Sequence, residues 1–131
     1  MNYLFDNNMS HPLARALRLL SQPVTHVRDI DALGPSAPDD LILSHAASRG
    51  YHVVTKDRQI LRTPAFRAII TEEEVGVFFL NVGRARQLRA WEEAKLVVKA
   101  WDNVVRFADK NTPPFTALVQ KNGVVKAIRS V

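Results

Sequence analysis

Three aspartates of this chain follow closely on short apolar segments that have the composition of β-strands. Asp6 comes after residues 2–5, Asp29 after 24–28 and Asp57 after 51–55. The carboxyl ends of parallel strands lie on one rim of a sheet, and α/β proteins bind their ligands there. Carboxylates gathered on such a rim repel one another unless a cation neutralises them, and Mg²⁺ or Mn²⁺ prefers oxygen ligands. The pattern therefore predicts a divalent-metal site, provided that the segments are parallel strands.

Two further acids, Asp39 and Asp40, stand where the sequence predicts the start of a helix over residues 39–48. Both also have a structural explanation, because an aspartate caps a helix well and the first turn favours negative charge. Asp6 and Asp29 have one too, as turn residues, and for Asp29 we favour it. The residues alone leave open whether Asp39 or Asp40 would bind a metal ion.

The composition narrows the classes of protein to which the chain can belong. Its 131 residues are 47% hydrophobic and 24% charged, which is typical of one globular domain, so we expect a single domain over residues 1–131. No cysteine is present, which excludes disulfides and thiolate metal sites. Apolar runs too short for a bilayer and an N-terminus without a signal-peptide pattern lead us to expect a cytoplasmic protein away from membranes. The net charge of +5 favours an anionic partner.

Strand-like and helix-like segments alternate over residues 1–80, which predicts βαβ units and a parallel sheet. Ser10 is a suitable N-cap for the first helix, and Gly50 is well placed to end the helix that starts at residue 39. The continuous apolar run VGVFFL at 75–80 is typical of a strand that is buried on both faces.

The C-terminal part is predicted to contain a long helix over 85–108, within the segment 84–110, and a β-hairpin over 115–130. Asn122-Gly123 would form a two-residue turn in this hairpin. We expect the arginines near the start of the helix on its solvent side. The residues assigned to its broad apolar face are Leu88, Trp91, Ala94, Val97, Val98, Trp101 and Val105, and the arginines are Arg84, Arg86 and Arg89.

Five segments carry a resemblance to a known family. They are FDNNMSHPLARAL, HVRDI, APDDLIL, GYHVVTKDRQIL and GVFFL, which follow one another over about residues 3 to 80. In this order they resemble the PIN domain (PilT N-terminus) nuclease superfamily, most closely the PIN-like group of VapC-type toxins. The resemblance implies a three-layer α/β/α fold around a mainly parallel sheet.

The resemblance also implies a metal-dependent endoribonuclease that binds one or two Mg²⁺ or Mn²⁺ ions and hydrolyses RNA phosphodiesters. It implies the toxin of a bacterial toxin–antitoxin system, with an antitoxin as partner, and it is compatible with a homodimer. The catalytic residues that it implies are Asp6, Asp39, Asp40 and Asp57, with Asp6, Asp40 and Asp57 as metal ligands. We expect Lys56 and Arg58 to position the phosphate, and Asn8 and Asp29 are secondary candidates.

The sequence departs from the family pattern at two places. Gln59 stands where many relatives have an acid, and Asn7 or Asn8 occupies another common acidic position. An amide can ligate a metal through its oxygen but brings no charge. An alternative function is therefore a catalytically weak or inactive PIN-like module that binds RNA or protein. The four histidines have no metal-like spacing, and we expect structural roles for them.

Overall fold

The chain forms one six-stranded sheet in the computed structural model, which describes residues 2–82 and 88–128. The strand order is β2-β1-β3-β4-β5-β6, and all neighbours run parallel except the β5–β6 pair. The strands are β1 (Tyr3–Phe5), β2 (Val24–His26), β3 (His52–Thr55), β4 (Gly76–Leu80), β5 (Phe115–Val119) and β6 (Val125–Ala127). This confirms the predicted α/β class with a mainly parallel sheet and a C-terminal hairpin.

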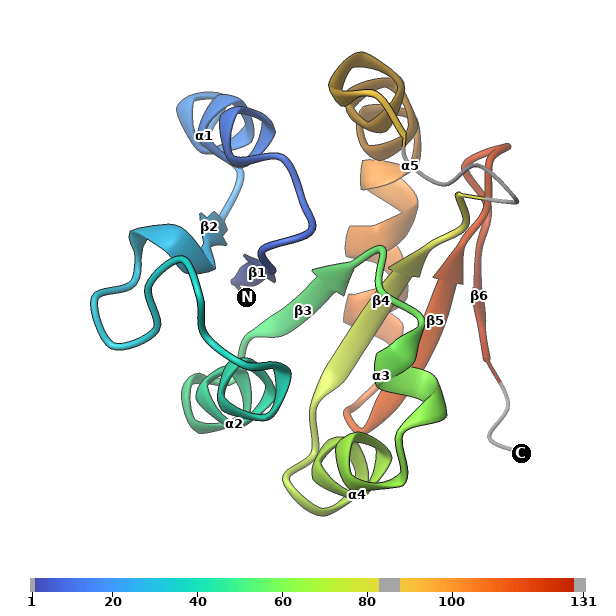
Figure 1. Ribbon diagram of the computed structural model, residues 1–131. Helices are drawn as coiled ribbons and strands as arrows, with labels where there is room; N and C mark the ends of the chain where they lie inside the picture. The colour runs from blue at the N-terminus through green and yellow to red at the C-terminus, as the bar shows by residue number, and fades with distance from the viewer. Residues whose placement is uncertain (1, 83–87, 129–131) are drawn as a thin grey trace.

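Helices cover both faces of the sheet, so that the molecule has three layers (Figure 1). α1 (His11–Leu19) and α5 (Ala90–Lys110) lie on one face. α2 (Asp39–Arg49), α3 (Gln59–Arg62) and α4 (Pro64–Glu72) lie on the other, and a short 3-10 helix, η1 (Val27–Asp29), follows β2. A parallel sheet needs both faces covered because its strands are apolar on both sides, and β1, β3 and β4 are buried throughout.

Each face of the sheet has its own hydrophobic core. On the face covered by α1 and α5, Trp101 of α5 packs edge-on against Tyr3 of β1 at a centroid distance of 4.8 Å. Its indole N–H donates to the side chain of Gln22 at 2.9 Å. In the same row of the sheet, next to His52, Gly76 lies so close to its neighbours that a Cβ there would be 2.5 Å from both His52 and Phe115. Only glycine fits here without a shift of these two rings.

The predicted helix boundaries are correct where local signals set them. The Ser10 hydroxyl accepts a hydrogen bond from Leu13 N at 3.2 Å and so caps α1. Gly50 ends α2 with a left-handed φ of 69°, which glycine adopts without a steric penalty. Ser10 fixes where α1 begins after the carboxyl end of β1, and Gly50 ends α2 at the opposite rim, shortly before β3.

Two predictions for the long helix are wrong. The helix starts at Ala90 and ends at Lys110 instead of spanning 85–108, and Arg84 and Arg86 lie outside the described residues. Trp91 and Val98 do not belong to its buried face, since they are 70% and 60% exposed. The buried face contains Glu93 instead.

The predicted strand 24–28 and the predicted hairpin turn also need correction. β2 ends at His26, whose ring accepts a hydrogen bond from Arg28 N at 3.1 Å, and the chain then turns into η1. The hairpin turn has three residues, 121–123, because Gln120 N donates to the Val124 carbonyl at 2.8 Å. Gly123 takes a positive φ of 88° in this turn, as a three-residue hairpin requires.

Within the described residues, no helix is long and apolar enough to cross a membrane.

Candidate metal-binding and active site

The carboxyl ends of β1 and β3 are neighbours, and each is followed by one of the predicted acids. Phe5 pairs with Val54 in the sheet, and Asp6 N donates to the Val54 carbonyl at 3.3 Å as the chain leaves β1. Asp57 lies two positions beyond the end of β3. The parallel pairing therefore brings these two acids to the same rim, as predicted.

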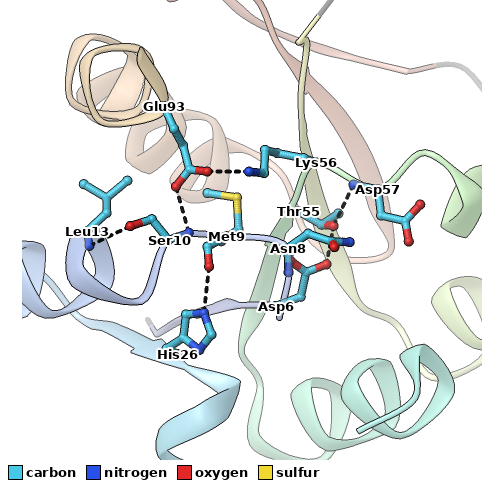
Figure 2. Close-up of polar contacts among 10 residues, drawn as sticks. All are labelled: Asp6, Asn8, Met9, Ser10, Leu13, His26, Thr55, Lys56, Asp57 and Glu93. Carbon is cyan, nitrogen blue, oxygen red and sulfur yellow. Dashed lines mark hydrogen bonds and ion pairs between the residues drawn. The ribbon is translucent and has the colours of Figure 1, made fainter. Parts of the chain in front are cut away.

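A chain of hydrogen bonds connects the two acids (Figure 2). The Asp6 carboxylate accepts a bond from Asn8 N at 3.0 Å and another from the Thr55 hydroxyl. The same hydroxyl oxygen accepts a bond from Asp57 N at 2.9 Å, and Asp57 Oδ1 accepts one from Gln59 N at 2.9 Å. These bonds leave Asp6 with little conformational freedom, and they hold the backbone of Asp57 beside it.

Asp6 is buried, with 1% of its surface exposed, and burial raises the pKa of its carboxyl to about 7. Hydrogen bonds from Thr55 and Asn8 act in the opposite direction, and the negative charges of Asp39 and Asp57 raise the pKa further. The mutual repulsion expected for clustered acids is therefore present, although burial contributes more than repulsion. Asp6, Asp39 and Asp57 lie close enough to affect one another electrostatically.

The two acids at the start of α2 differ in their surroundings. Asp39 is partly buried, and its pKa is raised by burial first and then by the charges of Asp57 and Asp40. Asp40 is exposed. Neither is the N-cap, which is Pro38 without a side-chain bond. The family resemblance implied Asp40 as a metal ligand, but partial burial and the coupling to Asp57 favour Asp39. The ligand role of either acid stays a prediction.

The carboxylates fit a divalent cation in charge but form no ready-made cage. Among the described residues, no three His, Cys, Asp or Glu side chains are gathered closely enough to hold a metal ion. We call Asp6, Asp39 and Asp57 the rim acids. Asp6 and Asp39 have raised pKa values, and a bound cation would offset the repulsion that contributes to these shifts. Mg²⁺ commonly binds through one or two carboxylates and keeps several waters. The donors therefore fit a hydrated Mg²⁺ or Mn²⁺ ion.

The two basic residues beside Asp57 differ in their surroundings. The Lys56 ammonium lies 2.6 Å from Oε1 of Glu93, whereas the Asp57 carboxylate points away from this pair (Figure 2). Arg58 is exposed and directly precedes α3. Arg58 therefore remains a candidate for phosphate contact, while the charge of Lys56 is already paired.

Sequence reasoning missed Glu93, a buried acid with 1% of its surface exposed. The signal was present, because Glu93 falls three and four positions before Leu96 and Val97 on the apolar stripe of α5. A charged residue at such a position needs a partner in the tertiary structure, and sequence spacing does not indicate that the partner is Lys56.

The two secondary candidates lie in different surroundings. Asp29 ends η1, and its carboxylate is held by the His11 ring at 2.9 and 3.0 Å, a hydrogen bond that lowers its pKa. In the described part of the chain, none of its contacts links it to the three rim acids. Asn8 is exposed beside Asp6 and contributes its backbone N–H to the Asp6 carboxylate.

The histidines have the surroundings of structural residues. His26 donates from Nε2 to the Met9 carbonyl at 2.9 Å and accepts from Arg28 N, which fixes its tautomer. His52 is buried between aromatic rings, and both of its ring nitrogens lack a hydrogen-bond partner among the described residues.

Comparison with known families identifies the class of protein. A family model described as a PIN-like domain matches residues 1–82, well over half of the chain. The chain therefore belongs to the PIN-like domain family, whose members are generally nucleases. The comparison with curated proteins gave no match, and neither did the comparison with solved structures. The matched residues include every acid of the rim, whereas Glu93 and α5 follow them.

Proposed function

We propose that this protein is a metal-dependent endoribonuclease that binds Mg²⁺ or Mn²⁺ through Asp6, Asp39 and Asp57. The observation that carries the proposal is the electrostatic coupling of these three acids on one rim of the sheet. Membership of a family whose members are generally nucleases supports it. Clustered carboxylates with raised pKa values lower the stability of the folded protein at neutral pH, and a bound cation removes that cost.

In this proposal, the residues of the rim have different roles in phosphodiester hydrolysis. When bound, the metal ion would supply a water of lowered pKa and would neutralise charge on the phosphate. Thr55 and Asn8 N hold the Asp6 carboxylate in one orientation. Arg58 is exposed and its guanidinium would contact a phosphate, and the net charge of +5 favours binding of a polyanion such as RNA.

We extend the proposal to a biological role as the toxin of a bacterial toxin–antitoxin pair, in the cytoplasm. The support is the resemblance of segments such as FDNNMSHPLARAL and GYHVVTKDRQIL to VapC-type toxins. A cognate antitoxin would then cover the acidic rim. Co-expression with the product of a neighbouring small reading frame, followed by co-purification and loss of cleavage, would support this role.

The direct test is cleavage of RNA in the presence of Mg²⁺ or Mn²⁺. We expect Asp57→Asn and Asp39→Asn to lower the rate at least about 100-fold, the usual scale for loss of a group that acts in the transition state, with little change in the melting temperature. Asp29→Asn is the matched control, because this acid is paired with His11 instead of the rim, and it should cleave like wild type. Equal activity in wild type, Asp57→Asn and Asp39→Asn would reject the site.

A second candidate function is an RNA- or protein-binding module with weak or no catalysis. It is supported by the absence of a three-ligand group among the described side chains, and by Gln59 and Asn7 or Asn8 at positions where relatives have acids. Calorimetry with Mn²⁺ separates the two functions. Retained RNA affinity without measurable Mn²⁺ binding would favour the binding module over the nuclease.

A further inference from the structure

Glu93 touches two separate segments of the candidate site, although it lies in α5 and outside the family match. Its Oε1 is 2.6 Å from the Lys56 ammonium, and its Oε2 accepts a hydrogen bond from Ser10 N at 2.8 Å. Figure 2 shows the carboxylate between these two partners. One buried side chain thus connects α5 with the segment after β1 and the segment after β3.

The contact with Ser10 fixes the far end of the short segment that begins at Asp6. The near end is fixed by the bond from Asn8 N to Asp6, and the middle by the bond from His26 to the Met9 carbonyl at 2.9 Å. Glu93 supplies the third attachment, at the residue that caps α1. The orientation of Asp6 therefore depends partly on a residue 83 positions away from Ser10.

The contact between Glu93 and Lys56 changes the net charge beside the rim. The Lys56 side chain is 20% exposed and precedes Asp57 directly, so an unpaired ammonium there would attract the rim carboxylates and repel a divalent cation. Glu93 neutralises this ammonium, and Lys56 in turn neutralises a carboxylate that would be costly to bury alone. The pair adds no net charge to the rim.

We propose that Glu93 is a positioning residue that fixes Ser10 and neutralises Lys56, so that the rim keeps the negative charge that binds a divalent cation. The inference rests on the proposed metal-dependent function. It assigns Lys56 to the support of the site instead of to phosphate binding.

The charge part is tested by Mn²⁺ calorimetry on wild type, Glu93→Gln, Lys56→Met and the double variant. Glu93→Gln leaves Lys56 unpaired, so Mn²⁺ should bind about 3- to 10-fold more weakly, the scale of one unit charge near the site. Lys56→Met should bind Mn²⁺ at least as tightly as wild type, and the double variant, in which the pair is again neutral, should return to within about twofold. Glu92→Gln is the matched control, because Glu92 pairs with Lys95 at 3.0 Å on the exposed side of the same helix.

General structural damage would weaken binding in all three variants, so the recovery in the double variant is the decisive readout. Binding in the double variant that is no tighter than in Glu93→Gln, or wild-type affinity in folded Glu93→Gln, would overturn the charge part. If wild type itself binds no Mn²⁺, the charge part fails together with the proposed function.

The positioning part has a readout that needs no metal. The Ser10 amide should exchange with solvent deuterium much faster in Glu93→Ala than in wild type, and Glu93→Gln should keep its protection because the amide oxygen still accepts the bond. Unchanged protection of Ser10 in folded Glu93→Ala would overturn this part, whatever the protein does with RNA.

Discussion

Thr55 is the residue on which the geometry of the candidate site most depends. Its hydroxyl donates to the buried Asp6 carboxylate and accepts from Asp57 N at 2.9 Å, so one oxygen joins both acids. Thr55 is fully buried, and water cannot replace a lost bond without rearrangement. A single hydroxyl therefore sets the orientation of one acid and the backbone position of the other.

Replacing this hydroxyl by a methyl group should damage both stability and function. We expect Thr55→Val to cost about 1–3 kcal/mol in the free energy of unfolding, because two buried groups lose their partner, and to weaken Mn²⁺ binding. Thr55→Ser keeps the hydroxyl and should bind Mn²⁺ like wild type. Urea unfolding and calorimetry measure the two effects. Identical Mn²⁺ affinity in Thr55→Val and wild type would show that the hydroxyl does not orient the acids.

Helix α5 has one face that packs against the sheet and another that is exposed to solvent. Residues ten positions apart are separated by about 80° around an α-helix, since each residue turns it by about 100°. Trp101 consequently faces the sheet with 6% exposure, while Trp91 is 70% exposed. Glu93 shares the buried face and reaches the site, so packing of α5 and order of the site are coupled.

The two tryptophans should respond very differently to truncation. Trp101→Ala should lower the free energy of unfolding by about 3–5 kcal/mol, the range for loss of a large buried side chain. The substitution also removes the hydrogen bond to Gln22. Trp91→Ala should change the free energy of unfolding by no more than about 0.5 kcal/mol. Chemical denaturation measures both variants. A cost for Trp91→Ala similar to that for Trp101→Ala would mean that Trp91 is buried in solution, for example against a partner.

For the whole molecule, two buried groups with opposite pKa shifts make opposing contributions to the pH dependence of stability. The pKa of the Asp6 carboxyl is raised from 3.8 to about 7, mainly by burial, and burial lowers the pKa of His52 from 6.5 to about 4. Between these limits the folded state holds one proton more than the unfolded state at Asp6, and one fewer at His52. The Asp6 term loses stability as pH rises to about 7, while the His52 term loses stability as pH falls to about 4.

The two terms should largely cancel in the metal-free protein between about pH 4.5 and 6.5. Asp6→Asn removes one term, so its stability should rise with pH relative to wild type. His52→Leu removes the other, and its stability should fall with pH relative to wild type. Each slope approaches about 1.4 kcal/mol per pH unit. Urea unfolding in EDTA measures them, with the double variant as control, and parallel curves for all four proteins would contradict the shifts.

The sequence by itself determined the class of fold and the main positions of the site. Strand-like segments that alternate with helices specify a parallel sheet, and capping residues such as Ser10 and Gly50 specify where helices begin and end. Asp6 and Asp57 then reach one rim because the carboxyl ends of neighbouring parallel strands lie together. These features depend on local patterns, which is why they could be read without coordinates.

Only the tertiary structure decided the surroundings of each acid. It buries Asp6, partly buries Asp39 while Asp40 stays exposed, and pairs Asp29 with His11. It also brings Glu93 to Lys56. The sequence could not show these outcomes, because burial and ion pairing depend on which distant segments pack against one another. Helix α5 brings Glu93 next to a candidate site whose other residues come from the first half of the chain.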